Sequence, residues 1–162
     1  MTTIVPNRRN LLAAGGSVLA SGVSGLVLPA HAQGLAPTSS MSGGANNYIK
    51  GAPTVNRIGK GGFWMSGTVR RAGDGTPLAG QRIQIWAHTV EGQEHEPQSH
   101  GATLTDKNGV FRLEMPQIIP LFGQAHGHLA YDSGEFKTVF LRPVMRSPKD
   151  KSLEAHFVLQ AA

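Results

Sequence analysis

The sequence contains no cysteine and has little charge, since only 15% of its 162 residues are Asp, Glu, Lys or Arg. Without cysteine there is no disulfide framework, no thiolate metal site and no cysteine nucleophile. A hydrophobic content of 40% is that of an ordinary globular protein and excludes a chain kept disordered by charge repulsion. The 21 glycines and 10 prolines follow no Gly-X-Y period, which excludes collagen. The composition therefore predicts a folded chain with many turns.

Helical periodicity is also missing, because no stretch after Pro29 has apolar residues at helical spacing for three turns. From residue 63 onward, short apolar or alternating runs are separated by turn residues, which is typical of an all-β sandwich. We predict about seven antiparallel strands and little helix, at residues 63–69, 81–87, 102–105, 110–114, 125–131, 137–142 and 155–160. The Asp74-Gly75 pair suits a tight turn with positive φ, and residues 106–109 predict a hairpin with glycine at the left-handed position.

Residues 1–32 have the pattern of an export signal. Arg8 and Arg9 precede a mildly apolar stretch that runs to Pro29, and Ala-His-Ala at 30–32 forms a small-x-small cleavage site. This segment resembles a twin-arginine signal, which implies a periplasmic protein that begins at Gln33 and has no membrane contact after cleavage. The alternative is an uncleaved membrane anchor. Residues 33–62 have little periodicity and predict an irregular arm, and residues 63–162 predict the sandwich.

The positive charge is too mild and too scattered to indicate a nucleic-acid partner. The net charge of +5 falls to +3 over 130 residues once residues 1–32 are removed. The two basic clusters, Arg70-Arg71 and residues 142–151, have no aromatic residues in a stripe between them and are interpreted as solvated. No Gly-x-Ser-x-Gly elbow and no phosphate-binding glycine loop occurs, which argues against a hydrolase triad and against nucleotide binding.

His126 and His128 form the strongest candidate site. Residues two apart on a strand point to one face, so both imidazoles can converge on a single ion while Gly127 faces the other way. Imidazole is a good ligand for iron, copper and zinc. The alternative is a pair of surface histidines without a ligand.

The wider pattern resembles the intradiol ring-cleavage dioxygenases. The matching segments are Ser-Gly-Thr-Val at 66–69, Gly-Thr-Pro-Leu-Ala-Gly at 75–80, Ile-Gln-Ile-Trp at 83–86, Thr-Asp-Lys-Asn-Gly-Val-Phe at 105–111, and Ala-His-Gly-His at 125–128. The resemblance implies non-haem iron held by His126 and His128, a catecholic or phenolic substrate, and ring opening by dioxygen. Noncatalytic transthyretin-like sandwiches share the first half of the pattern, so the alternative is a binding module for a metal or an aromatic small molecule.

The resemblance weakens at that family's other site residues, which are two tyrosinate ligands and an arginine that steadies charge on the substrate. Glu94 stands where the first tyrosine is expected, and no tyrosine lies between Phe111 and His126. Tyr48 falls in the arm, and Tyr131 has the wrong parity to share the face of the histidines. Two imidazoles with one carboxylate is the facial arrangement of Fe(II) oxygenases and also suits zinc or copper.

The remaining candidates surround this set. The loop from His88 to His100 holds three His and three Glu in thirteen residues, and it is either part of the site or a solvated connection. His88 is favoured as a further ligand because it lies two residues past Trp86. Trp86 is a core residue or a packing surface for an aromatic ligand. Gln124 is the polar residue nearest to the position of the family's arginine and is the candidate catalytic group. The sequence leaves the oligomeric state open.

Overall fold

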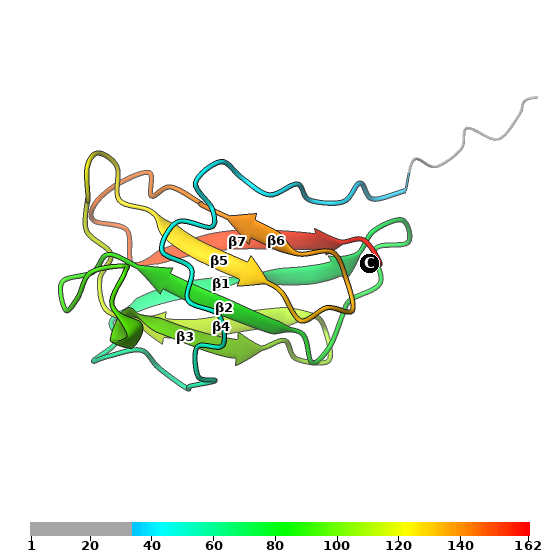
Figure 1. The fold of residues 1–162 in the computed structure, drawn as a ribbon, viewed down its shortest axis with the longest axis horizontal. Helices are drawn as coiled ribbons and strands as arrows, with labels where there is room; N and C mark the ends of the chain where they lie inside the picture. The colour runs from blue at the N-terminus through cyan, green and yellow to red at the C-terminus, as the bar shows by residue number, and fades with distance from the viewer. Residues whose placement is uncertain (1–33) are drawn as a thin grey trace, which may run out of the picture. The chain divides into compact units, whose positions relative to one another are not determined.

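The structure, a computed structural model, describes residues 34–162; the expected export signal and Gln33 lie outside the described residues. These residues form a two-layered all-β sandwich (Figure 1). Its strands are β1 (Phe63–Arg71), β2 (Arg82–Ala87), β3 (His100–Leu104), β4 (Val110–Met115), β5 (Gly127–Tyr131), β6 (Val139–Leu141) and β7 (Ser152–Leu159). A three-residue 3-10 turn, η1 (Pro97–Ser99), precedes β3. The predicted sandwich with little helix is confirmed.

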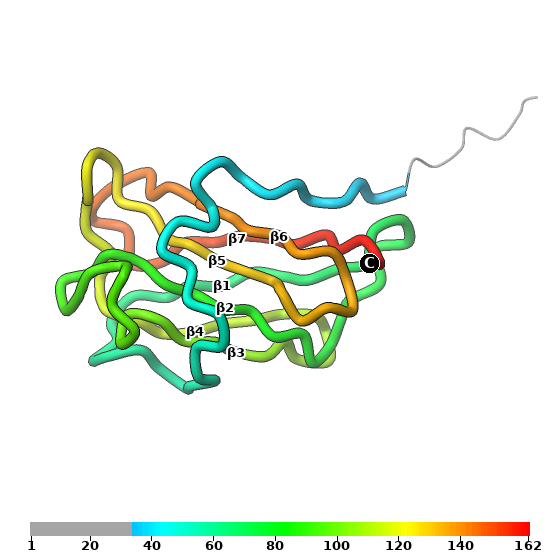
Figure 2. The backbone as a smooth tube through the Cα atoms, in the orientation of Figure 1, coloured from blue at the N-terminus to red at the C-terminus, as the bar shows by residue number. Residues whose placement is uncertain are grey.

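One sheet has the order β4-β1-β7 and the other the order β3-β2-β5-β6. All strand pairs are antiparallel except β1 and β7, which are parallel, from Trp64 opposite Ser152 to Arg71 opposite Leu159. Figure 2 shows these two strands, the first and last of the sandwich, side by side. The expectation of purely antiparallel strands is wrong for this pair, because no hairpin joins the two strands and fixes opposite directions.

The predicted hairpin at residues 106–109 is also wrong, although its turn chemistry is present. Asp106 Oδ1 accepts hydrogen bonds from the backbone N–H groups of Asn108 and Val110, and Gly109 has φ +72°. The turn connects β3 in one sheet to β4 in the other, because β3 pairs with β2 and β4 pairs with β1. The Asp74-Gly75 turn does contain the expected positive φ, at Gly75 (+70°).

The core lies between the sheets and is built from the alternating residues of each strand. On β1 the inward residues Phe63, Met65 and Val69 are fully buried. Phe111 of β4 and Phe157 of β7 meet edge to face in this core, with ring centroids 6.2 Å apart. The opposite faces of the two sheets are therefore available for other contacts.

The arm, residues 34–62, contains no strand, and its backbone pairs with the strands only through isolated β-bridges. Figure 1 shows the arm (cyan) crossing β5 and β2 on the outer face of the four-stranded sheet. Gln84 of β2 holds it there, because its side chain donates to the Ile49 carbonyl and accepts from the Ala52 N–H. The outer face of this sheet is thus buried beneath the arm. No helix among residues 34–162 is long and apolar enough to cross a membrane.

Candidate metal centre

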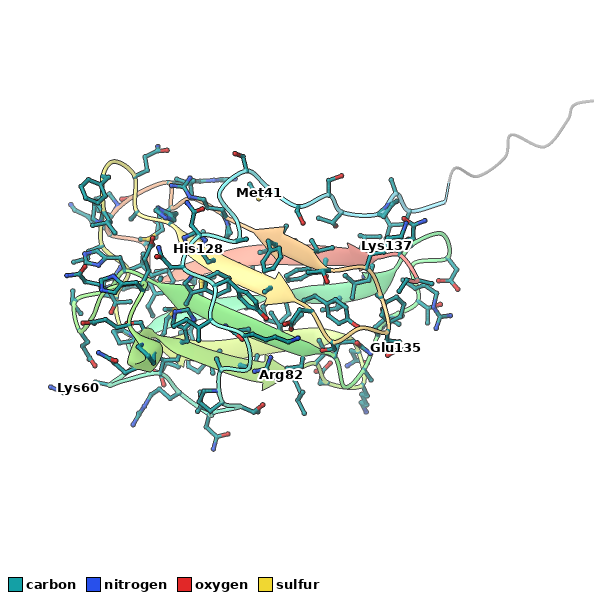
Figure 3. All side chains as sticks on the ribbon, in the orientation of Figure 1. Met41, Lys60, Arg82, His128, Glu135 and Lys137 are labelled. Carbon is teal, nitrogen blue, oxygen red and sulfur yellow. The ribbon has the colours of Figure 1, made fainter. Side chains whose placement is uncertain are left out.

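Two histidines at the start of β5 project beneath the arm. Gly127 faces the core, where an added Cβ would lie 2.9 Å from Met65 Cε, so His126 and His128 on either side of it face outward. Their ring centroids are 5.0 Å apart with planes at 75°. Figure 3 shows His128 at the point where the arm passes over the sheet.

Glu94 reaches the same point from the loop between β2 and β3. Its Oε2 lies 3.4 Å from His128 Nε2 and 3.6 Å from His126 Nε2. One ligand atom from each of the three residues lies within 4.8 Å of the others. All three are buried, with exposed fractions of 7% for Glu94, 6% for His126 and 0% for His128. From the sequence, the loop at residues 88–100 could be part of the site or a solvated connection. In the structure it supplies one carboxylate, that of Glu94, to the two histidines.

The hydrogen bonds on the far side of each ring fix which nitrogen carries the proton. His126 Nδ1 lies 2.9 Å from the Gln124 carbonyl oxygen, and His128 Nδ1 lies 3.0 Å from the Gly44 carbonyl oxygen. Because a carbonyl only accepts, each Nδ1 is assigned the proton and each Nε2 keeps a lone pair that faces Glu94. Arg142 Nη2 lies 3.3 Å from His126 Nδ1 and could only donate to a lone pair there, so it opposes this tautomer; the assignment follows the shorter contact with Gln124 at 2.9 Å.

This arrangement brings lone pairs together with no proton between them. Glu94 Oε2 and His128 Nε2 are buried and have no hydrogen-bond partner. Such groups are costly in a protein interior unless a cation compensates them. Two neutral imidazoles and a carboxylate, with each ring oriented by a carbonyl, form the kind of ligand set that iron, zinc and copper use in proteins.

Burial keeps His128 in the form that binds metals. The pKa of His128 is lowered, chiefly because the buried ring is removed from water, and the nearby positive charge of Arg142 lowers it further. The Gly44 carbonyl and the Glu94 carboxylate oppose this shift without reversing it. Near neutral pH the ring is therefore neutral, and no proton has to leave before a metal binds.

Trp86 supports the site and has no free ring face. It is fully buried and stacks between His100 on β3 and His128 on β5, with centroids 5.4 and 5.1 Å away and planes within 9°. Its Nε1–H donates to the Asn46 carbonyl oxygen of the arm at 2.9 Å. In this arrangement Trp86 orients a ligand ring and does not present a face to an aromatic substrate.

His88 and Gln124, two other predicted site residues, lie beside the cluster. His88 is not among the three residues whose ligand atoms converge, although its Nδ1 is buried without a hydrogen-bond partner. The register of β2 and β5, in which Ala87 pairs with Gly127, places His88 next to His126. The residue Gln124 is exposed, and it contacts His126 through its backbone carbonyl.

Neither of the two tyrosines bonds to this cluster. Tyr131 lies in the core between the sheets, where its hydroxyl accepts the Phe136 N–H, as the parity of β5 predicts. Tyr48 lies in the arm and donates its hydroxyl to Asp132. The pKa of Tyr48 is raised, first by burial and then by that carboxylate, so the phenol stays protonated.

Two residues of the site have no signal in the sequence. Asn47 in the arm donates from Nδ2 to Glu94 Oε1 at 2.7 Å, which leaves Oε2 directed at the histidines. Arg142, interpreted from sequence as part of a solvated cluster, is half-buried beside His126. Asn47 lies 47 positions from its partner, and no repeat or spacing links two such residues.

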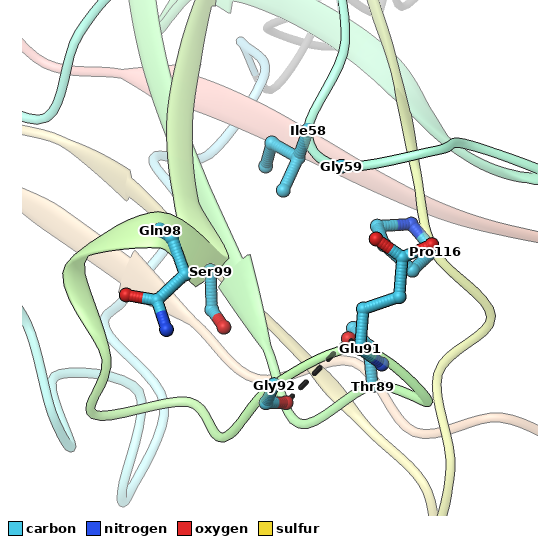
Figure 4. A pocket seen from close by; sticks show the side chains of 8 residues that line it. All are labelled: Ile58, Gly59, Thr89, Glu91, Gly92, Gln98, Ser99 and Pro116. Carbon is cyan, nitrogen blue, oxygen red and sulfur yellow. Dashed lines mark hydrogen bonds between the residues drawn. The ribbon is translucent and has the colours of Figure 1, made fainter.

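The other side of the 88–100 loop borders a separate cleft of about 140 Å³. Figure 4 shows Ile58 and Gly59 of the arm across from Thr89, Glu91 and Gly92, with the Thr89–Gly92 hydrogen bond marked. The Glu91 carboxylate accepts the Lys60 N–H here. Glu94, His126 and His128 do not line this cleft. The loop therefore presents Glu94 to the histidines on one side and Glu91 to the cleft on the other.

Several solved structures of similar architecture are dioxygenases by name. Hydroxyquinol 1,2-dioxygenase from Pseudomonas putida DLL-E4 is 14% identical, with a TM-score of 0.60 over 82% of this chain and 69% of that chain. For 3-chlorocatechol 1,2-dioxygenase from Rhodococcus opacus 1CP the values are 17%, 0.58, 80% and 74%. The fold is that of the intradiol dioxygenases.

A third similar structure is the dioxygenase domain of a dioxygenase and carbohydrate-binding fusion from Streptomyces sp. SirexAA-E. It is 16% identical, with a TM-score of 0.58, and the match covers 78% of this chain and 99% of that domain. No family model matches the chain. No curated protein sequence matches it either. The likeness therefore supports an intradiol-type fold, and the chemistry has to be argued from the site.

Proposed function

We propose that this protein is a metalloenzyme of the intradiol type, which holds non-haem iron through Glu94, His126 and His128 and opens the ring of a catecholic compound with dioxygen. The observation that carries the proposal is the convergence of one ligand atom from each of three buried residues, of which Glu94 Oε2 and His128 Nε2 have no hydrogen-bond partner. The resemblance of the sequence and the likeness of the fold supply the substrate class. Copper and zinc are the alternative metals, because the same ligand set suits them.

The ligand set favours ferrous iron. Tyrosinate ligands stabilise the ferric state, and neither described tyrosine bonds to the cluster. Two imidazoles and one carboxylate form the facial arrangement of ferrous oxygenases, which leaves coordination positions open for substrate and dioxygen. Iron bound there would supply the redox chemistry that a reaction with dioxygen requires.

The protein's own groups orient the site and set its charge. The carbonyls of Gln124 and Gly44 hold both imidazoles with Nε2 inward. Arg142 carries a guanidinium with no carboxylate within 4.0 Å among residues 34–162, and residues 1–33 contain no Asp or Glu. A guanidinium without a carboxylate partner favours an anionic ligand, and a catecholate is one.

A noncatalytic metal-binding module is the second candidate, and the burial of the site favours it. The three ligand residues are less than 10% exposed, and the arm covers the stacked rings. A closed shell of protein ligands is typical of a structural metal, whereas a catalytic metal keeps a position open.

One experiment separates the two candidates. The purified protein is loaded with ferrous iron under anaerobic conditions, its metal content is measured, and oxygen uptake is followed with catechol, protocatechuate and hydroxyquinol. The enzyme proposal predicts about one iron per chain and uptake with at least one of these compounds, and both are lost in Glu94→Ala. Bound iron without uptake would favour the binding module. No bound metal would contradict both candidates.

The visible spectrum of the oxidised iron protein gives an independent readout. We expect no charge-transfer band of a ferric tyrosinate, because the two described tyrosine hydroxyls bond to Asp132 and to the Phe136 N–H. Such a band would show that a tyrosine reaches the metal. Export to the periplasm by the twin-arginine route stays part of this proposal.

A further inference from the structure

We propose that Asn47 of the arm is a positioning residue for the metal centre, so that metal binding and docking of the arm stabilise each other. The inference rests on the metal site of the proposed function, and it adds a role that neither the sequence pattern nor the likeness in fold assigns. Its basis is the set of bonds that joins three arm residues, Gly44, Asn46 and Asn47, to the site.

The first step concerns the Glu94 carboxylate. Asn47 Nδ2 donates to Oε1 at 2.7 Å, while Oε2 faces both Nε2 atoms at 3.4 and 3.6 Å. Glu94 lies in the loop between β2 and β3, and its backbone is held by His100, whose Nε2 donates to the Glu94 carbonyl at 2.8 Å. The side-chain amide of Asn47 therefore sets which carboxylate oxygen is offered to a metal.

The second step concerns the remaining contacts of the same arm segment. The Gly44 carbonyl accepts from His128 Nδ1 at 3.0 Å, and the Asn46 carbonyl accepts from the Trp86 indole at 2.9 Å. Trp86 in turn stacks on the His128 ring. Over residues 44–47 the arm thus bonds to one metal ligand through its backbone and to another through the Asn47 side chain.

The third step is that this segment is held by side chains of the sheet and not by a strand ladder. No bridge of the arm to the sheet falls within residues 44–47. Asn47 itself adopts φ +57°, a left-handed conformation that Asn tolerates better than most residues. A segment attached in this way can separate from the sheet without breaking a strand pair. Because linkage is reciprocal, a metal that fixes Glu94 and His128 must strengthen the docking of the arm, and a docked arm must strengthen metal binding.

The test compares two glycine substitutions in adjacent arm residues. Asn47→Gly removes the donor to Glu94 and fits the positive φ, whereas Asn46→Gly adds the same chain flexibility but keeps the Asn46 carbonyl that Trp86 uses. Zinc is the probe metal, and its affinity is measured by competition with a chromophoric chelator. We expect Asn47→Gly to weaken zinc binding by about 10-fold or more and Asn46→Gly by less than about 3-fold.

Two further readouts distinguish positioning from a general loss of stability. Cobalt(II) in the site should change its visible absorption spectrum in Asn47→Gly and keep it in Asn46→Gly, because only the first variant frees the carboxylate. Zinc should slow hydrogen exchange at the arm amides of residues 44–48 in the wild type, and should do so much less in Asn47→Gly. The cobalt spectrum reports the geometry of the ligands, and hydrogen exchange reports docking of the arm. Both are measured while the sandwich stays folded.

The outcomes separate this inference from the proposed function. Wild-type protein that binds zinc, with equal affinities and equal cobalt spectra for the two variants, would overturn the role of Asn47 and leave the metal site standing. Zinc binding without any change in exchange of the arm would overturn the linkage. Wild-type protein that binds no zinc would overturn the metal site itself, and the inference with it.

Discussion

At the scale of single residues, the site divides into a part that the sequence predicts and a part that it cannot. The alternation of a strand places His126 and His128 on one face, and the resemblance to the intradiol dioxygenases puts Glu94 at the position of a ligand. Two of the three partners that orient these groups, the Gly44 carbonyl and the Asn47 amide, come from far along the chain. His128 and the Gly44 carbonyl are separated by 84 positions, and such a contact depends on how the arm crosses the sheet. Contacts between residues so far apart produce no local pattern in the sequence from which they could be predicted.

Two histidine substitutions test the site directly. We expect His126→Ala to weaken metal binding by more than about 100-fold, since it removes one of three ligands and leaves the other two buried. The matched control is His156→Ala on β7, whose ring is exposed and bonds to Thr68 Oγ1 at 3.0 Å. Chelator competition with zinc gives both affinities. Similar losses in the two variants would contradict the assignment of the metal ligands.

At the scale of strands and turns, local sequence patterns predicted which segments form strands and roughly where these begin and end. They predicted less well which strands pair with each other. The predicted run at residues 63–69 became β1, which ends two residues later, and the run at 155–160 became β7, which begins three residues earlier. The turn at residues 106–109 has the predicted glycine conformation but joins different sheets. Pairing is decided by which faces bury together, and a single turn does not carry that information.

Gly67 marks where two strands approach too closely for a side chain. An added Cβ would lie 1.6 Å from the Ala155 carbonyl oxygen of β7 and 2.7 Å from Phe111 Cζ. Gly67→Ala therefore has to push the backbones of β1 and β7 apart, and we expect a loss of at least about 3 kcal/mol in the free energy of unfolding.

The neighbouring substitution Ser66→Ala serves as the control for the same strand. Ser66 faces outward and lines an open cleft on the three-stranded sheet, so its replacement should change stability by less than about 0.5 kcal/mol. Urea unfolding followed by circular dichroism measures both variants. A Gly67→Ala protein as stable as the wild type would mean that β1 and β7 do not pair in the register described.

At the scale of the whole sandwich, the arm turns one outer face of a two-layered fold into a second buried layer. That layer is polar and contains Gln84, His100 and His128, each buried and each hydrogen-bonded to the backbone of the arm or of the 88–100 loop. The composition of residues 33–62 predicts irregular structure but gives no indication of which face they cover. Stability of the metal-free protein should therefore depend on this polar layer as well as on the core.

The pH dependence of stability follows from the buried histidines. Burial lowers the pKa of His100 and of His128 from the ordinary value of 6.5. The unfolded chain therefore binds protons that the folded chain does not, and the stability that these rings contribute above pH 6.5 is lost as the pH falls below it. We expect the urea midpoint of the metal-free protein to fall between pH 7 and pH 5.

Substitution of His100 should make that decline shallower. In the fold His100 donates from Nε2 to the Glu94 carbonyl, and its Nδ1 lies 3.4 Å from the Gln84 side-chain nitrogen. A second proton on the ring would sit on Nδ1 and face the N–H donor of Gln84. His100→Gln removes this titrating group, whereas His95→Gln, at an exposed position of the same loop, should leave the profile unchanged. Parallel declines in the wild type and His100→Gln would contradict a neutral, buried His100.

The parallel pairing of β1 and β7 also has a consequence for synthesis on the ribosome. β1 is the middle strand of its sheet, and one of its two neighbours is the last strand of the sandwich to emerge. Until that strand is released from the exit tunnel, one side of β1 has unpaired backbone groups and the core between the layers is open at that edge. The nascent chain therefore completes this sandwich only after β7 has left the tunnel.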